Sequence, residues 1–142
     1  IDTSHSLIID SSSSSSSSSS STACYTAIHD NNGELVIGIA DMNIFSLLDS
    51  SYMKTLNQKI QQSKIIIADG NLSKEGFHTL VTLCQENNKP LFFEPTSDHK
   101  CLLPFYANAI DKVTLIKPNT SELIEMINHA LQIGLIKSGK AI

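Results

Sequence analysis

The chain has 142 residues, enough for one domain with a substantial core, and its apolar runs are all too short to span a membrane. Its net charge of -4 provides no electrostatic attraction for nucleic acid or an anionic membrane surface, so we expect neither as a partner. Three well-separated cysteines fit neither a disulfide framework nor a CxxC metal site, and the histidines lack zinc-site spacing. We therefore expect reduced thiols in an intracellular, cytoplasmic protein, with an organelle as the open alternative.

Both ends of the sequence indicate a piece of a longer protein. The chain has no initiator Met and no signal-peptide or transit-peptide pattern, and residues 137–142 resemble the start of a further segment. We therefore interpret it as an internal or truncated fragment.

Residues 11–21 are eleven consecutive serines, here called the serine tract, and they follow a short strand candidate at 5–9. The tract has nothing apolar to bury, and its hydroxyls compete for backbone hydrogen bonds, so we expect it to be disordered. It could be a phosphorylated regulatory tract, but a neutral expansion of a loop is the simpler interpretation.

Shortening the serine tract to a few residues is expected to leave the free energy of unfolding nearly unchanged. The entropy of loop closure costs only about 0.6 kcal/mol for each doubling of loop length. Urea denaturation of the full and shortened chains measures the difference. Sharp, dispersed NMR signals from the serines would contradict the expected disorder.

The segment after the serines predicts a β-hairpin. Residues 23–28 and 35–40 are rich in β-prone side chains, and residues 30–33 between them have the composition of a turn. The Asn32-Gly33 pair favours the positive φ angles that a tight type I′ turn requires. We expect antiparallel pairing within this hairpin, which should not join a parallel sheet.

From residue 44 onward, apolar residues first recur at helical spacing as far as Ile60, and strands then alternate with helices. Strands are expected at 64–68, 90–94 and 113–116, and helices from Ser73 to about Asn88 and from Asn119 to about Leu131. Residues 64–68 are apolar on both faces, as in a strand that is covered on both sides. The order predicts an α/β fold with a parallel sheet flanked by helices.

Each of the three expected strands is followed by polar residues. These clusters lie at 69–71, 94–97 and 119–122. The carboxyl ends of parallel strands meet at one edge of the sheet, where α/β proteins bind their ligands. One such cluster could simply end a strand, but three along one edge predict a cleft.

The last cluster allows two interpretations. Asn119 and Glu122 have the spacing of a helix capping box. A helix that begins directly after a strand is also a common binding site for anionic ligands, because its free N–H groups and its dipole point there. The local pattern alone leaves both interpretations open.

Six segments, in this order, resemble the PfkB/ribokinase-type carbohydrate kinases. They are TACYTA at 22–27, NGEL at 32–35, IADM at 39–42, DGNLS at 69–73, FFEPTS at 92–97 and PNTSE at 118–122. The resemblance is strongest to the pseudouridine kinase branch, which includes kinase domains fused to pseudouridine-5′-phosphate glycosidase. It covers nearly the whole chain except the serine tract and the C-terminal end.

This resemblance implies a partial ribokinase-like core at 44–142 and a projecting β-hairpin lid at 1–43, which the serine tract interrupts. It implies phosphorylation of pseudouridine at its 5′-hydroxyl, with ATP and Mg²⁺ as cofactors. Ribose or adenosine are alternative substrates, and a truncated, inactive binding or dimerisation module is an alternative function. A homodimer through the lid and fusion to a glycosidase domain are implied as further associations.

The resemblance also assigns roles to four residues. The family's Asn-x-x-Glu motif, here Asn119 and Glu122, helps to place the ATP phosphates and hydrated Mg²⁺, so Glu122 would act on the metal through water. By position, Glu94 would face the phosphate-transfer cleft and Asn71 would face the sugar. The family's Gly-x-Gly-Asp segment, which carries the catalytic base, does not occur in this sequence. We therefore expect no catalytic residue here and no activity from this chain alone.

Overall fold

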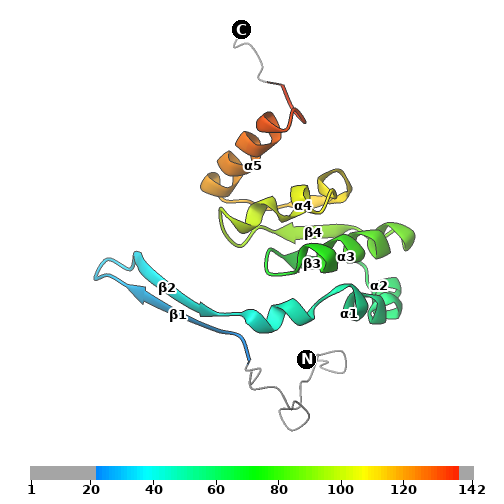
Figure 1. Ribbon diagram of the computed structural model, residues 1–142, viewed down its shortest axis with the longest axis horizontal. Coiled ribbons are helices and arrows are strands. Elements are labelled where there is room, and N and C mark those ends of the chain that lie inside the picture. Colours follow the sequence, from blue (N-terminus) through cyan, green and yellow to red (C-terminus); the bar gives the residue numbers. More distant parts are fainter. Residues whose placement is uncertain (1–21, 138–142) are drawn as a thin grey trace. The chain divides into compact units, whose positions relative to one another are not determined.

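The computed structural model describes residues 22–137 (Figure 1). The strand candidate at 5–9 and the serine tract lie outside the described residues. The chain divides into two compact units between Leu47 and Leu48. The first unit contains the hairpin strands and a short 3₁₀ helix, and the second contains a parallel sheet with its helices.

The first unit is built on an antiparallel hairpin, as predicted. Strand β1 (Cys24–His29) pairs with β2 (Leu35–Asp41), so that Cys24 lies opposite Asp41. The hairpin forms its own two-stranded sheet, separate from the parallel strands. A 3₁₀ helix (Asn43–Leu47) follows it.

The turn of the hairpin is not the predicted type I′ turn. Gly33 has a φ of 85°, whereas Asn32 is not among the residues with positive φ, and type I′ requires both. The loop is longer because the Asp30 carboxylate accepts hydrogen bonds from the N–H groups of Asn32 at 2.8 Å and Glu34 at 2.9 Å. These backbone hydrogen bonds, that of Glu34 first, lower the pKa of Asp30 below its ordinary value.

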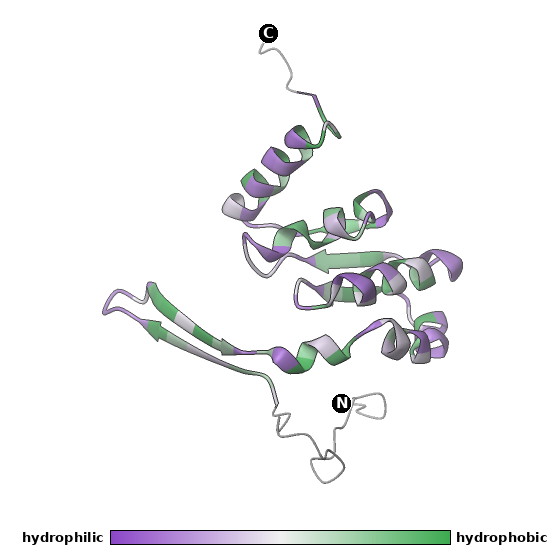
Figure 2. Ribbon diagram, in the orientation of Figure 1, coloured by the Kyte–Doolittle hydropathy of each residue, from purple (hydrophilic) through white to green (hydrophobic). Residues whose placement is uncertain are grey.

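Every residue of both hairpin strands is exposed in the structure. The exposed side chains include large apolar ones such as Val36 and Ile39, and Figure 2 shows the apolar character of β2. An isolated two-stranded hairpin is at best marginally stable in water. The hairpin is therefore a surface that gains stability when something covers it.

The second unit contains the predicted parallel sheet. Strands β3 (Ile66–Asp69), β4 (Leu91–Glu94) and β5 (Leu115–Ile116) lie in this order, and each begins slightly later than the sequence predicts. Ile66 lies opposite Leu91, and Phe92 lies opposite Leu115. Because neighbouring strands run the same way, their carboxyl ends share one edge.

The helices have the predicted positions, with one exception. Ser73 caps α3 (Lys74–Glu86), and Asn119 caps α5 (Thr120–Gln132), as the sequence indicates. The helical stretch expected from residue 44 is interrupted, since α1 (Ser50–Thr55) and α2 (Asn57–Gln62) are separate helices after the 3₁₀ turn. Among residues 22–137, no helix combines the length and the apolar character needed to cross a membrane.

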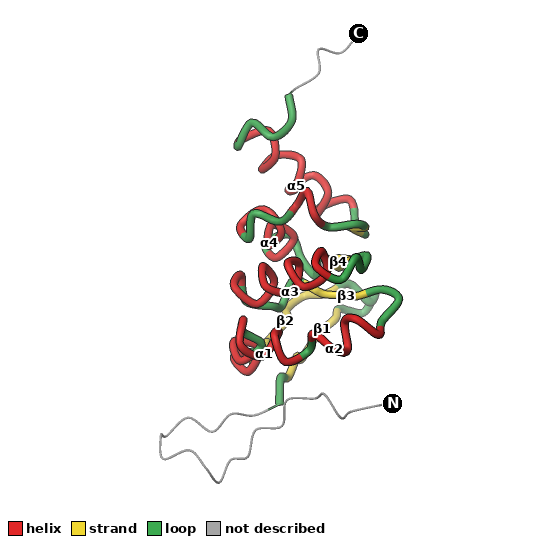
Figure 3. The backbone as a smooth tube through the Cα atoms, turned by 90° about the vertical axis from the view of Figure 1, so that its right-hand side faces the viewer, coloured by secondary structure: helices red, strands yellow, loops and turns green. Residues whose placement is uncertain are grey.

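One face of the parallel sheet is covered by helices. Helix α3 and the short helix α4 (Leu103–Tyr106), which follows the 3₁₀ helix Lys100–Leu102, lie on the same side of β3 and β4 (Figure 3). Phe77 of α3 packs edge-to-face on Phe93 of β4, with ring centroids 5.2 Å apart, and both side chains are fully buried. This contact is at the centre of the main core.

The prediction that the first parallel strand is covered on both sides is wrong, because the opposite face of the sheet is exposed. Alternation along β3 puts Ile66 and Ala68 towards the core, while Ile67 on the other face is 66% exposed. Ile65 and Leu115, also apolar, are exposed as well. The described residues thus bury one face of the sheet and leave apolar side chains on the other.

Candidate functional site

The three predicted polar clusters meet at the carboxyl edge of the sheet. Gly70, after β3, donates its N–H to the carbonyl of Glu94 at the end of β4 at 3.0 Å. Ser121, in the first turn of α5, donates its hydroxyl to the carboxylate of Asp98 at 2.7 Å. The segments that follow the three strands are thereby linked along one edge, one pair through the backbone and the other through side chains.

Asn119 and Glu122 form the capping box that their spacing predicts. The Asn119 side-chain oxygen accepts the N–H of Glu122 at 2.9 Å, and Glu122 Oε2 accepts the N–H of Asn119 at 2.8 Å. Glu122 is only 4% exposed. Its Oε1 has no hydrogen-bond partner among the described residues and is not sealed from solvent. One carboxylate oxygen therefore holds the helix start, and the other is free to accept from water.

Glu94 lies at the same edge beside a cation. Lys117 Nζ is 3.6 Å from Glu94 Oε2, and both side chains are substantially exposed. An exposed ion pair of this kind contributes about 0–1 kcal/mol to stability, so this pair has little effect on folding. It does place one positive charge two residues before Asn119, the first residue of the capping box.

Asn71 is bound on both sides of its carboxamide. Its backbone N–H and its Nδ2 donate to the two carboxylate oxygens of Asp69, at 3.0 Å and 2.7 Å. Its Oδ1 accepts a hydrogen bond from Lys100 Nζ at 2.6 Å. The predicted sugar-facing residue thus belongs to a three-residue network of Asp69, Asn71 and Lys100, which we call the edge network.

The backbone next to the edge network is strained. Thr96 has a φ of 72°, a region that β-branched residues rarely adopt. In this conformation its Oγ1 accepts the N–H of Gly70 at 3.0 Å. A Cβ on Gly70 would lie 2.6 Å from the Pro95 carbonyl oxygen and 2.8 Å from Lys100 Cβ. The ends of β3 and β4 therefore come too close together for any residue but glycine.

Gly70→Ala is expected to lower the free energy of unfolding by about 1–3 kcal/mol, because the added methyl group overlaps backbone atoms that cannot rotate away. Urea denaturation measures the change. Gly38→Ala is the matched control, since a Cβ there meets only the side chain of exposed Tyr25. Equal, small effects of both substitutions would contradict the tight approach at Gly70.

Residues 4–141 match the profile of the pfkB family carbohydrate kinases. The chain belongs to this family. It is 32% identical over 110 residues to the pseudouridine kinase of Escherichia coli, an alignment that covers 78% of this chain and 34% of that protein. It is 29% identical over 108 residues to the pseudouridine kinase of Arabidopsis thaliana, covering 75% of this chain and 28% of that protein.

Two further similarities extend these matches. The pseudouridine-metabolizing bifunctional protein of Schizosaccharomyces pombe is 35% identical over 103 residues, which are 72% of this chain and 13% of that protein. A carbohydrate kinase from Agrobacterium tumefaciens superposes with a TM-score of 0.64 at 26% identity, covering 74% of this chain and 34% of that chain. The predicted α/β fold of a carbohydrate kinase is confirmed. The pfkB chain spans about a third or less of the length of these curated relatives.

The cysteines of this pfkB chain are all free, as predicted. Burial raises the pKa of Cys84 to about 11, and burial together with nearby Glu125, Glu122 and Asp98 raises that of Cys101 to about 11. At neutral pH both are thiols and therefore weak nucleophiles. Among residues 22–137, no group of three His, Cys, Asp or Glu side chains is arranged to hold a metal ion directly.

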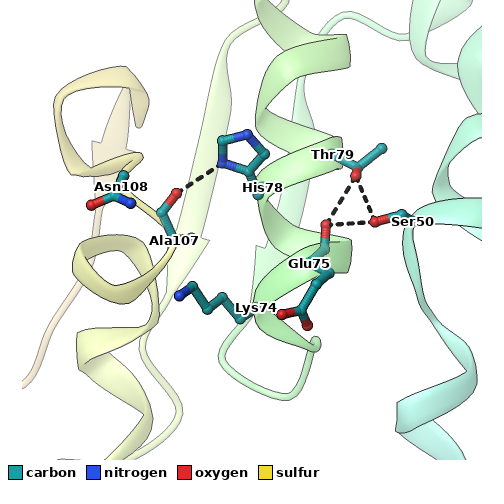
Figure 4. Close-up of a pocket in the computed structure, with 7 residues that line it drawn as sticks. All are labelled: Ser50, Lys74, Glu75, His78, Thr79, Ala107 and Asn108. Atoms are coloured by element: carbon teal, nitrogen blue, oxygen red, sulfur yellow. Dashed lines mark hydrogen bonds between the residues drawn. The ribbon is translucent and has the colours of Figure 1, made fainter.

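A surface pocket of about 220 Å³ lies beside α3, and none of the predicted site residues lines it (Figure 4). His78 donates Nδ1–H to the carbonyl of Ala107 at 2.9 Å on one wall. On the other wall, Thr79 donates its hydroxyl to Ser50 at 2.9 Å. The polar groups that Figure 4 shows bonded to each other are thus satisfied within the protein.

The sequence did not identify three residues of the edge as candidates: Lys100, Lys117 and Asp98. Lys100 and Asp98 lie in a segment without a regular pattern, and their partners are 29 and 23 residues away. Lys117 carried a local signal, because it directly precedes Pro118 at the end of a strand.

Proposed function

We propose that this chain is part of an ATP-dependent kinase that transfers the γ-phosphoryl group of ATP to the 5′-hydroxyl of pseudouridine. Membership of the pfkB family supports the kinase activity, and the pseudouridine kinases of Escherichia coli and Arabidopsis thaliana support the substrate. The single observation that carries the proposal is the Asn119–Glu122 box. It sets a buried carboxylate, with one oxygen open to water, at the ligand-binding edge of a parallel sheet.

The residues of this edge fit the handling of a nucleoside triphosphate with its metal. The N-terminus of α5 and the nearby Lys117 favour negatively charged phosphates. Glu122 would hold water molecules of a hydrated Mg²⁺ with its free oxygen, and Asn119 keeps that carboxylate in place. When bound, Mg²⁺ neutralises the charge that develops on the transferred phosphoryl group.

The other two assigned residues lie along the same edge. Glu94 would face the cleft in which the phosphoryl group moves, and Asn71 would bind the sugar. The two side chains follow neighbouring strands whose final residues, Asp69 and Glu94, are directly opposite each other. Catalysis in such a site is mainly the positioning of acceptor and phosphate, which a rigid sheet edge provides.

The hairpin supports a role as the lid over the substrate. Both of its strands expose apolar side chains, which a bound nucleoside or the lid of a second subunit would cover. A homodimer through the lid is therefore part of the proposal. The bifunctional relative in Schizosaccharomyces pombe supports fusion to a glycosidase domain, and the three free cysteines support a cytoplasmic location.

A substrate panel on the full-length protein tests this function. With ATP and Mg²⁺, we expect pseudouridine to be phosphorylated with a higher kcat/KM than uridine, adenosine or ribose. A preference for ribose or adenosine would contradict the substrate assignment and leave the kinase intact. Absence of turnover with all four would favour the second candidate, an inactive binding or dimerisation module.

A further inference from the structure

Lys100 is a half-buried cation whose partner is a neutral amide. Its ammonium group donates to Asn71 Oδ1 at 2.6 Å, and no other hydrogen bond or ion pair of this group occurs among the described residues. A lysine on a protein surface normally extends into water, because ordering its long side chain costs entropy. Contacts elsewhere in the structure must therefore explain why Lys100 lies against Asn71 instead of extending into water.

The cause is the close approach of the two strand ends. Gly70 brings the chain after β3 against Lys100 Cβ, and Thr96, in the segment after β4, accepts the N–H of Gly70. The Cys101 N–H donates to the Ser97 carbonyl at 2.8 Å and fixes the backbone that carries Lys100. The stem of Lys100 thus begins beside Gly70, the residue that directly precedes Asn71.

The edge network allows only one orientation of the Asn71 carboxamide. A lysine ammonium only donates hydrogen bonds, and an ionised carboxylate only accepts them. Between Lys100 and Asp69, the amide oxygen must therefore face Lys100 and the amide nitrogen must face Asp69. If the amide rotated by 180°, its nitrogen would face the ammonium group of Lys100, donor against donor. Its oxygen would face the carboxylate of Asp69, acceptor against acceptor.

This fixed orientation determines what Asn71 offers to a ligand. Of the two hydrogens on Nδ2, one is donated to Asp69, and the other has no partner among the described residues. Asp69 is exposed, and each of its carboxylate oxygens can accept a further hydrogen bond. One free donor beside one free acceptor matches a hydroxyl group, which accepts through its oxygen and donates its proton.

We infer that Lys100 is a positioning residue that holds the Asn71 amide as a donor, so that Asn71 and Asp69 together bind a hydroxyl group of the sugar. This inference rests on the proposed function, in which Asn71 faces the sugar. Lys100 itself touches neither the sugar nor the phosphate in this arrangement. Its effect therefore passes entirely through Asn71, which makes the inference testable by a double-mutant cycle.

The first experiment tests the orientation without any activity measurement. In the 142-residue chain, NMR would follow the side-chain amide resonances of Asn71 in the native protein, Lys100→Met and Lys100→Arg. We expect a clear shift of these resonances in Lys100→Met and near-native positions in Lys100→Arg, which retains a donor. Lys89→Met is the matched control, since Lys89 is also half-buried but precedes the amino end of β4. Unchanged Asn71 resonances in Lys100→Met would overturn the inference.

The second experiment measures steady-state kinetics in the full-length kinase. Lys100→Met should raise KM for the nucleoside about tenfold, the loss of one hydrogen bond to the sugar, because the Asn71 amide is no longer held as a donor. The values of kcat and of KM for ATP should remain within about twofold. Lys100→Arg should recover most of the loss. In an Asn71→Ala background, Lys100→Met should have no further effect on KM.

The outcomes of the two experiments separate the inference from the proposed function. A rise in KM for ATP or a fall in kcat, additive with Asn71→Ala, would overturn the inference in favour of a direct phosphate contact. A uniform loss of activity together with a lower melting temperature would overturn it in favour of a purely structural role. Absence of kinase activity in the native full-length protein would overturn both the proposed function and the sugar-binding role of this network.

Discussion

The 142-residue chain by itself is expected to phosphorylate no nucleoside or sugar above background. Its sequence contains no Gly-x-Gly-Asp segment, which in the family the chain resembles supplies the catalytic base and the N–H groups that stabilise the transferred phosphoryl group. Loss of even one such donor commonly lowers the rate by a factor of roughly 10²–10³, and here the base would be missing as well. A coupled assay of ADP release with pseudouridine, ATP and Mg²⁺ measures this.

The control for this prediction is the full-length protein assayed under the same conditions. Turnover by the full-length protein and none by the chain would locate the missing chemistry outside these residues. Robust ATP-dependent turnover by the chain alone would refute the prediction, because a base and a charge-stabilising group would then have to lie within it.

The second large effect is expected for Glu122→Gln in the full-length kinase. The capping box survives this change, because a glutamine side-chain oxygen accepts the N–H of Asn119 as the carboxylate does. The negative charge that would hold hydrated Mg²⁺ is lost. We therefore expect kcat to fall roughly 10–100-fold, as for other residues that act on a metal indirectly, here through bound water, with little change in melting temperature.

Glu125→Gln is the matched control for this substitution. Glu125 lies on the same helix, is exposed, and takes no part in the capping box. The Glu125→Gln variant should retain native turnover. This result would show that the effect of Glu122→Gln comes from the charge at that position and not from the loss of any negative charge on α5. Near-native turnover in Glu122→Gln would leave the motif as a helix cap and remove the main support for the proposed metal role.

Asn119→Asp tests the other residue of the capping box. An aspartate still caps α5 and suits the helix dipole, so stability should be retained. The new negative charge would repel the triphosphate, and we expect a higher KM for ATP. Melting temperature and kinetics from one preparation separate the two effects, and an unchanged KM for ATP would place the phosphates elsewhere.

The sequence by itself determined the order and type of the main elements. Alternating strand and helix patterns predicted β3, α3, β4, β5 and α5, and the capping residues Ser73 and Asn119 begin their helices in the structure. These features depend on side chains a few residues apart, so local sequence contains the information. The shared edge of the three polar clusters also followed, because parallel strands necessarily align their carboxyl ends.

Some predictions were wrong where a neighbouring contact changed the local preference. Asn32-Gly33 favours a type I′ turn, but hydrogen bonds to Asp30 stabilise a longer loop. The apolar run ending at Ala68 predicts burial on both faces, yet Ile67 is exposed, because the described helices cover the other face of the sheet. Apolar character indicates that a side chain gains from burial, and it does not say which part of the protein provides the cover.

Only the tertiary structure decided which side chains of the edge touch each other. Lys100 meets Asn71 across 29 residues and Asp98 meets Ser121 across 23, and neither pair follows a periodic pattern. The Lys100–Asn71 contact depends on the register of β3 against β4 and on the tight approach at Gly70. The Asp98–Ser121 contact depends on the register of β4 against β5, the strand that leads into α5. Such contacts arise from strand pairing and loop packing, which act between residues that the local sequence does not relate.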